Sequence, residues 1–258
     1  MWRVCDMPSN SKTHLNRAFD HLENVIYIMA EVIKGRSAEE IKRHLVLDDP
    51  FSNSSEKYRK EVSSWLIGDY VKGFSPEALK VFARIMTSET IETQTKREIL
   101  FWKNCERDEL VKAITLEQIF PAYHKGAAFL LREDVIDYIV REKGFTAYMS
   151  DKRVTNYLAI TSKLGMANAN GRNIDLNYFR PNKKSVMAIL YFLFNSGLSS
   201  SKILHSDDFK YLLLDERDLV SYLVEMNASG IIEFAMAGNI VRLEPKINFE
   251  VLPDALEE

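Results

Sequence analysis

The sequence predicts a mainly α protein, in which a helical N-terminal domain precedes a winged-helix-like α+β part with two short β-hairpins. Glycine and proline are scarce, at 10 and 7 of 258 residues, which argues against a many-stranded architecture. Apolar residues recur at three- and four-residue steps over residues 1–145, as on the buried face of a helix. Two later turn signals, Asn170-Gly171 and Gly238-Asn239, favour hairpins. We therefore expect a helical domain over 1–145 and a winged-helix-like domain with two helix–hairpin units over 146–258.

Helices are expected throughout the first domain, because apolar stripes alternate with capping signals. A stripe over 14–33 ends at Gly35, and Ser37 with Glu40 forms a capping box that opens a helix to residue 47. The remaining helices are expected over 56–71, over 78–86 after Ser75 and Pro76, over 89–119, and over 132–142 before Gly144. Thr115 is expected to cap a short new helix that Pro121 breaks, and no strand is expected before residue 145.

The second domain is expected to repeat a helix followed by a hairpin. Ser150-Asp151 would cap a helix to Leu164, and the segment 168–171 would turn the chain into a return strand over 174–178. An almost wholly apolar helix is predicted over 183–194 after Asn182, and we expect it to lie at the centre of the core of this domain. The second unit is expected as a helix over 216–226 after Asp215, with strands over 231–234 and 240–243.

Composition bounds the class of protein. An apolar fraction of 46% and a charged fraction of 28% are ordinary for a folded chain. The N-terminus lacks the apolar core of a secretory signal, and no apolar run approaches the length of a membrane span. Cys5 and Cys105 lie far apart, without metal or disulfide spacing. We therefore expect a cytoplasmic protein without membrane contact.

Charge is distributed unevenly although the net charge is only −3. Residues 151–184 hold seven lysines or arginines against two aspartates, whereas residues 207–258 hold four basic against twelve acidic residues. A basic segment beside an acidic tail is typical of a protein with one surface that faces nucleic acid. Solvation of ordinary surfaces is the alternative explanation.

The basic segment coincides with the first helix–hairpin unit, which suits the second half of a winged helix-turn-helix. In that module one helix enters the major groove and the wing contacts the backbone or the minor groove. The candidate nucleic-acid-binding residues are Lys152, Arg153, Thr155, Asn156, Lys163, Arg172, Arg180, Lys183 and Lys184. Asn156 could pair with adenine, whereas the basic residues would mostly bind phosphates. The alternative is that both hairpins merely complete a compact domain.

The second unit differs, because its helix carries Asp215, Glu216, Asp218 and Glu225, which would repel phosphates. We interpret it as a packing or protein-contact wing. Catalytic motifs are missing from the sequence: the five histidines are scattered, and the glycines form no phosphate-binding loop. We expect no enzyme activity, no cofactor and no metal site.

Read in order, the chain resembles the BrxA family of bacterial BREX phage-defence systems. The resemblance is carried by Ser37-Ala-Glu-Glu-Ile-Lys42, Thr95-Lys-Arg-Glu-Ile-Leu-Phe-Trp102 with Arg107-Asp-Glu-Leu110, Ser150-Asp-Lys-Arg-Val154 leading to Gly165, and Leu219-Val-Ser-Tyr-Leu223 leading to Gly-Ile-Ile-Glu-Phe234. It implies a small non-enzymatic component encoded beside a methyltransferase and other large BREX proteins. It also implies a helical N-terminal part, winged-helix character near the C-terminus, and binding to DNA.

The expected function is that of a non-catalytic accessory component of a BREX system that binds double-stranded DNA and works beside other BREX proteins. The alternative is an assembly adaptor that binds protein through helical surfaces such as residues 56–71 and touches no nucleic acid. DNA sequence preference, the choice between DNA and RNA, and oligomeric state stay open at this point.

Overall fold

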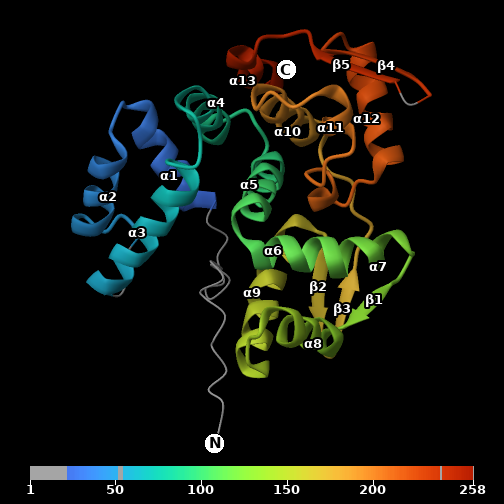
Figure 1. The fold of residues 1–258 in the computed structure, drawn as a ribbon. Helices are drawn as coiled ribbons and strands as arrows, with labels where there is room; N and C mark the ends of the chain where they lie inside the picture. The colour runs from blue at the N-terminus through green and yellow to red at the C-terminus, as the bar shows by residue number, and fades with distance from the viewer. Residues whose placement is uncertain (1–21, 52–54, 239, 258) are drawn as a thin grey trace, which may run out of the picture. The chain divides into compact units, whose positions relative to one another are not determined.

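The computed structural model describes residues 22–51, 55–238 and 240–257, and over these residues the chain is mainly helical, with two small antiparallel sheets (Figure 1). This confirms the predicted fold class. Contacts within the chain group the described residues into two compact units. The α9 unit holds residues 100–181 and 206–217, and the α10 unit holds the rest. Neither unit is continuous in sequence, and the single boundary predicted at residue 145 falls inside the α9 unit.

Four helices open the α10 unit: α1 (Leu22–Ile33), α2 (Ala38–Leu47), α3 (Glu56–Tyr70) and α4 (Pro76–Thr87). Helix α1 packs on α4, and α2 packs on α3. The predicted capping box is present, since the Ser37 side chain accepts from the Glu40 N–H while the Glu40 carboxylate accepts from the Ser37 N–H. The part of the first predicted helix over 14–21 lies outside the described residues.

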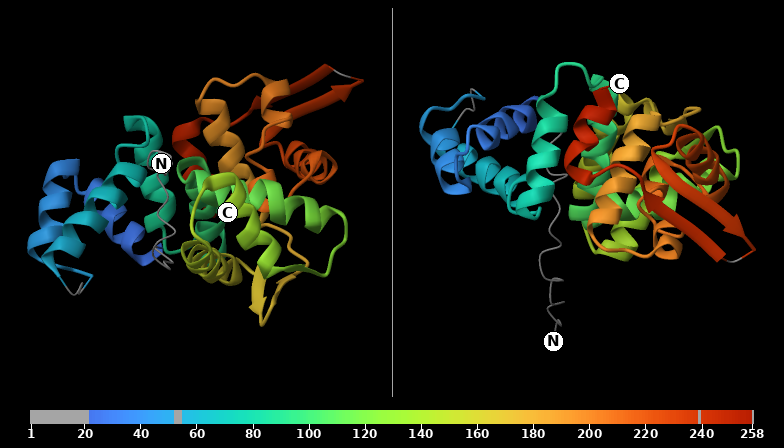
Figure 2. Two further views of the ribbon diagram at one scale, coloured as in Figure 1. Left: turned by 60° about the horizontal axis from the view of Figure 1, so that its bottom comes forward. Right: turned by 90° about the horizontal axis from the view of Figure 1, so that it is seen from above.

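The second part of the α10 unit contains α10 (Lys183–Asn195), α11 (Ser200–Leu204), most of α12 (Glu216–Ala228), the hairpin β4 (Ile232–Ala237) with β5 (Ile240–Pro245), the short η3 (Phe249–Val251) and α13 (Leu252–Glu257). Both predicted strands of this hairpin form, and each is longer than expected. The hairpin extends beyond the helices of its own unit (Figure 2). Aromatic rings join the two parts of the unit: the centre of the Phe82 ring lies 4.7 Å from that of Phe74 and 6.3 Å from that of Phe192, which in turn lies 5.3 Å from that of Phe249.

Helix α10 is the core helix that its apolar sequence predicts, with every residue from Ser185 to Leu193 buried. Its first turn is held by Glu98, which is 1% exposed and belongs to α5 (Thr93–Arg107). The Glu98 carboxylate accepts from the Asn182 N–H at 2.8 Å, from the Ser185 hydroxyl at 2.5 Å and from the Gln94 amide at 3.0 Å. Burial raises the pKa of Glu98.

Among the described helices, none has the length and apolar character needed to cross a bilayer.

The long helix predicted over 89–119 is divided at Asp108, which caps α6 (Glu109–Ile114) through hydrogen bonds to the Leu110 and Val111 N–H groups. The prediction that Thr115 starts a new helix and that Pro121 breaks it is wrong. The chain instead continues through the π-helical segment η1 (Thr115–Ile119) into α7 (Phe120–His124). Pro121 lacks the N–H that would bond to the preceding turn, and the wider π turn, which bonds the Phe120 N–H to the Thr115 carbonyl, accommodates this loss.

The α9 unit contains a three-stranded sheet made of β1 (Phe129–Leu131), β2 (Ala167–Asn170) and β3 (Asn173–Leu176), with β3 in the centre. Ile174 of β3 is 1% exposed and pairs with Leu130 of β1 on one side and with Ala169 of β2 on the other. The expectation of no strand before residue 145 is therefore wrong. The segment pairs because β3, about 45 residues later, supplies a partner edge, and no local sequence pattern encodes that.

Candidate nucleic-acid interface

Between β1 and β2 lie two consecutive helices, α8 (Arg132–Lys143) and α9 (Ala147–Leu164), which pack on each other. The order strand, helix, helix, strand, strand is that of a winged helix-turn-helix. In such a module the second helix is the presented one and the last two strands form the wing, and α9 and β2–β3 hold these places in this chain. Both helices end at a left-handed glycine, Gly144 with φ 69° and Gly165 with φ 78°. A residue with a side chain would be strained at either position, so these two glycines set the direction in which the chain leaves each helix.

One face of α9 is fixed in the core of its unit. Val154, Tyr157, Leu158 and Thr161 are buried. The Tyr157 hydroxyl lies 3.0 Å from the Thr115 hydroxyl, and its ring meets that of Phe101 edge-on. Because one face of α9 is held in this way, the residues on its opposite face are the ones presented to solvent.

The exposed face begins at Tyr148, which is 79% exposed, and continues through Asp151, Lys152 and Thr155. Arg132, at the start of α8, holds this face: it donates to the Asp151 carboxylate at 2.8 Å and to the Thr155 hydroxyl at 2.6 Å. The negative charge of Asp151 is therefore paired within the protein, and the Thr155 hydroxyl is occupied. Lys152 stands beside them and makes no hydrogen bond or salt bridge with other described residues.

The wing presents Arg172 at its tip. Asn170 pairs with Asn173, so Gly171 and Arg172 form the two-residue loop, in which Gly171 has a φ of 58°. The Arg172 carbonyl accepts from the Arg132 N–H at 2.9 Å, which ties the loop to the start of α8. The Arg172 side chain is exposed, and the backbone of Arg172 is held by this hydrogen bond to Arg132.

Two of the predicted contacts, Arg153 and Asn156, are buried, at 3% and 5% exposure. The Arg153 guanidinium lies 3.8 Å from the centre of the Phe145 ring, and it donates to the Met149 carbonyl at 3.4 Å. Burial lowers the pKa of Arg153. This position suits a structural cation over an aromatic ring and leaves Arg153 no surface with which to reach a phosphate.

We expect Arg153→Ala to lower the free energy of unfolding by about 1–2 kcal/mol, because the contact with Phe145 and the packing of the aliphatic stem are lost. Lys152→Ala, one position away on the exposed face, is expected to change it by less than about 0.5 kcal/mol. Urea unfolding followed by circular dichroism measures both. Equal effects of the two substitutions would contradict the assignment of Arg153 to the core.

The other predicted basic residues fall in different places. Arg180 is exposed and belongs to the α9 unit. Lys183 and Lys184 are half-buried at the start of α10 in the other unit, where the Lys183 ammonium donates to the Ser229 hydroxyl at 3.3 Å. Among the predicted contacts, the exposed basic residues of the α9 unit are therefore Lys152, Lys163, Arg172 and Arg180.

Sequence reasoning missed Tyr148 and Arg132. Tyr148 precedes Lys152 by one helical turn, so both lie on one face of α9, but the helix was expected to begin only at residue 150. It begins at Ala147, because the Thr146 side chain accepts from the Met149 N–H at 3.3 Å and so caps the helix. The expected cap, Ser150, is instead a buried helical residue whose hydroxyl donates to the Thr146 carbonyl.

The comparisons with known proteins found no match to the chain among protein-family models, curated proteins or solved structures. The function proposed below therefore rests on the residues of this chain and on the resemblance stated above.

Proposed function

We propose that this protein binds double-stranded DNA through the α9 unit and acts without catalysis. The observation that carries the proposal is the winged helix-turn-helix order of β1, α8, α9, β2 and β3, with basic side chains exposed on both α9 and the wing. In this module the presented helix enters the major groove and the wing follows the backbone.

The exposed residues divide into two roles. Tyr148 and Lys152 lie in the first turns of α9, the part of a presented helix that approaches base edges. Arg172 at the wing tip and Lys163 near the end of α9 are placed to contact phosphates, which position the protein without reading the sequence. Arg132 supports the interface by neutralising Asp151, which would otherwise repel the DNA.

The test is the salt dependence of binding to a fluorescently labelled DNA duplex, followed by anisotropy. If four basic residues each displace condensed counterions, the logarithm of the association constant should fall with the logarithm of the salt concentration with a slope of about −3.6. The absence of binding at low salt, or a slope near zero, would overturn the proposal.

We place this DNA binding in a BREX phage-defence system, in the cytoplasm and beside other BREX proteins, on the strength of the segment resemblance alone. The gene neighbourhood tests that placement, since a BREX component is expected to lie beside a methyltransferase gene. A neighbourhood without other BREX genes would remove the placement and leave the DNA-binding proposal standing.

A protein-binding adaptor is the second candidate, and exposed apolar side chains favour it. Phe129 and Leu131 on the edge strand β1 are 49% and 47% exposed. Edge strands with apolar side chains are common sites of protein pairing. The surface of α3, proposed from sequence for this role, carries charged residues such as Glu56, Lys57 and Lys60. Recovery of one large partner at high salt, without any shift of DNA mobility, would favour the adaptor.

A further inference from the structure

His124, at the end of α7, lies beside two aspartates at the start of α12. Its side chain and those of Asp215 and Asp218 each offer one ligand atom, and these three atoms lie within 4.8 Å of one another. The side chains of His124 and Asp215 are 24% and 40% exposed, so solvent reaches them. One imidazole and two carboxylates around a shared point form a donor set that divalent transition metals bind.

The two ring nitrogens of His124 have different surroundings, and this difference fixes the position of the proton. Nε2 lies 3.0 Å from the carbonyl oxygen of Leu213. A carbonyl oxygen only accepts, so Nε2 carries the proton and donates it to this bond. In the neutral ring Nδ1 therefore carries a lone pair, and Nδ1 is the nitrogen that lies near the Asp215 carboxylate. Histidines that bind a metal through one nitrogen usually donate the other N–H in this way.

The carbonyl group that orients His124 is itself held in place. Leu213 has a φ of 56°, in the left-handed region, and its side chain is buried. Its N–H donates to the Lys210 carbonyl at 3.0 Å, and the N–H of Leu214 donates to the Phe209 carbonyl at 3.1 Å. The peptide group that contains the Leu213 carbonyl is thus fixed on both sides. The imidazole that bonds to this carbonyl is therefore oriented before any ligand arrives.

The distance between Nδ1 of His124 and Oδ2 of Asp215 is 3.7 Å, which is too long for a hydrogen bond. Two ligand atoms of one zinc ion, each about 2.0–2.1 Å from the metal at a tetrahedral angle, stand about 3.4 Å apart. A small movement of one side chain is therefore enough for both to bind the same ion. A lone pair and a carboxylate that face each other also repel, and a cation between them removes this repulsion.

Asp218 reaches the same point through local helix geometry. Asp215, which belongs to the α9 unit together with His124, immediately precedes α12, and Asp218 lies in the first turn of this helix. Residues three apart lie on one side of a helix, so this turn brings the two carboxylates together. Each carboxylate has two oxygens, so a ligand atom remains even where the other oxygen has a partner within the protein. The helix dipole accounts for two aspartates at this end, but it does not account for the lone pair of His124.

We propose that His124, Asp215 and Asp218 bind a zinc ion, with water completing its coordination. The imidazole ligand favours zinc over magnesium and calcium, which prefer oxygen ligands alone. The charge of the ion balances those of the two carboxylates, and the ion holds the turn before α12 to the end of α7. The site is independent of the DNA binding proposed for α9. The sequence favoured no metal site, because His124 lies far from both aspartates along the chain and no motif connects them.

The test adds zinc to the metal-free protein and measures binding by isothermal titration calorimetry, with magnesium as the comparison ion. We expect saturable zinc binding and no measurable magnesium binding at the same concentration. Asp218→Asn, which keeps the size of the side chain, and His124→Ala should each weaken zinc binding on the order of 100-fold, the upper end of what the loss of a residue that only supports a ligand costs. His205→Ala is the matched control, because it removes another exposed histidine and should leave zinc affinity unchanged.

The proposal fails if zinc does not bind, or if it binds the Asp218→Asn and His205→Ala proteins with equal affinity. Magnesium binding as tight as zinc binding would show that carboxylates alone hold the ion, and this also contradicts the site. His124→Ala removes the hydrogen bond to Leu213 as well as the ligand, so Asp218→Asn, which leaves that bond in place, decides the matter if the histidine variant unfolds. The result stands whatever the DNA-binding experiments show, since none of these residues belongs to the proposed DNA interface.

Discussion

Simultaneous replacement of Lys152, Lys163 and Arg172 by alanine is expected to weaken duplex DNA binding on the order of 100-fold, at about 1 kcal/mol for each lost phosphate contact. All three side chains are exposed on α9 or its wing, so their removal leaves no cavity. The slope of the logarithm of affinity against the logarithm of salt should become less negative by about 2.7. Fluorescence anisotropy at several salt concentrations measures both quantities.

The matched control replaces Lys42, Lys57 and Lys80, three exposed lysines of the α10 unit, and so changes the net charge by the same amount. We expect this control to alter DNA affinity by less than about threefold, since only the long-range field of the protein changes. If both triple variants bind equally weakly, the attraction is general and no interface exists at α9. If neither variant loses affinity, the DNA-binding surface lies elsewhere.

The helices of this protein could be predicted from sequence wherever their ends are decided locally. The Ser37–Glu40 capping box and the Asn182 cap of α10 are contained in a few adjacent residues, and both form as predicted. The strand β1 could not be predicted, because Phe129-Leu-Leu131 lies between helical patterns and becomes a strand only by pairing with β3. With β1 as its first strand, the order of elements is that of a whole winged helix-turn-helix, of which the sequence had indicated only the second half.

The candidate interface was predicted only in part, because it too depends on contacts between separate segments of the chain. Residue type and spacing placed Lys152 and Arg172 on the surface, but they gave no means to separate Lys152 from its neighbour Arg153. Arg153 is buried because Phe145, in the turn before α9, offers its ring to the guanidinium. That contact depends on where α9 begins, and the beginning was misplaced by about one turn.

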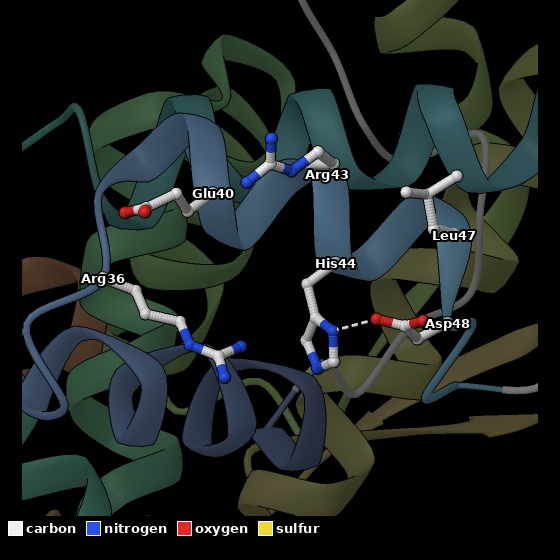
Figure 3. Close-up of a pocket in the computed structure, with 6 residues that line it drawn as sticks. All are labelled: Arg36, Glu40, Arg43, His44, Leu47 and Asp48. Atoms are coloured by element: carbon white, nitrogen blue, oxygen red, sulfur yellow. Dashed lines mark hydrogen bonds and ion pairs between the residues drawn. The ribbon is translucent and has the colours of Figure 1, made fainter.

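The contacts of His44 with Asp48 (Figure 3) and with Tyr27 were missed because their parts come from separate segments. His44 and Asp48 are four residues apart on α2, which is a readable spacing, but the partner that completes the contact is Tyr27 on another helix. The anchor of Arg36 is Glu31, a carboxylate buried on α1. Sequence patterns within one helix reveal the spacing of His44 and Asp48, but they do not reveal contacts with residues of another helix such as Tyr27 or Glu31. From the sequence, His44 therefore appeared only as one of several scattered histidines.

Glu98→Ala is expected to lower the free energy of unfolding by about 2–4 kcal/mol, because the half-buried Asn182 N–H and the buried Ser185 hydroxyl lose their acceptor and a small cavity forms. Both partners belong to the first turn of α10, which is the central helix of its unit. Glu98→Gln keeps one oxygen acceptor in nearly the same volume, so its cost should be smaller, at about 1 kcal/mol. Urea denaturation measures both variants, and equal costs would contradict a role based on hydrogen bonding.

The pH dependence separates the charge of Glu98 from its hydrogen bonds. Burial raises the pKa of this carboxyl, so the folded protein holds the proton more tightly than the unfolded chain does. The free energy of unfolding of the natural protein should therefore fall as pH rises from the unfolded value of about 4.3 through the raised pKa, and stay lower above it. The amide introduced by Glu98→Gln cannot ionise, so the stability advantage of the natural protein over this variant should be larger near pH 4 than at pH 7. An advantage that does not change with pH would mean that Glu98 ionises in the folded state as easily as in the unfolded chain, and that its three hydrogen bonds fully offset the cost of burying the charge.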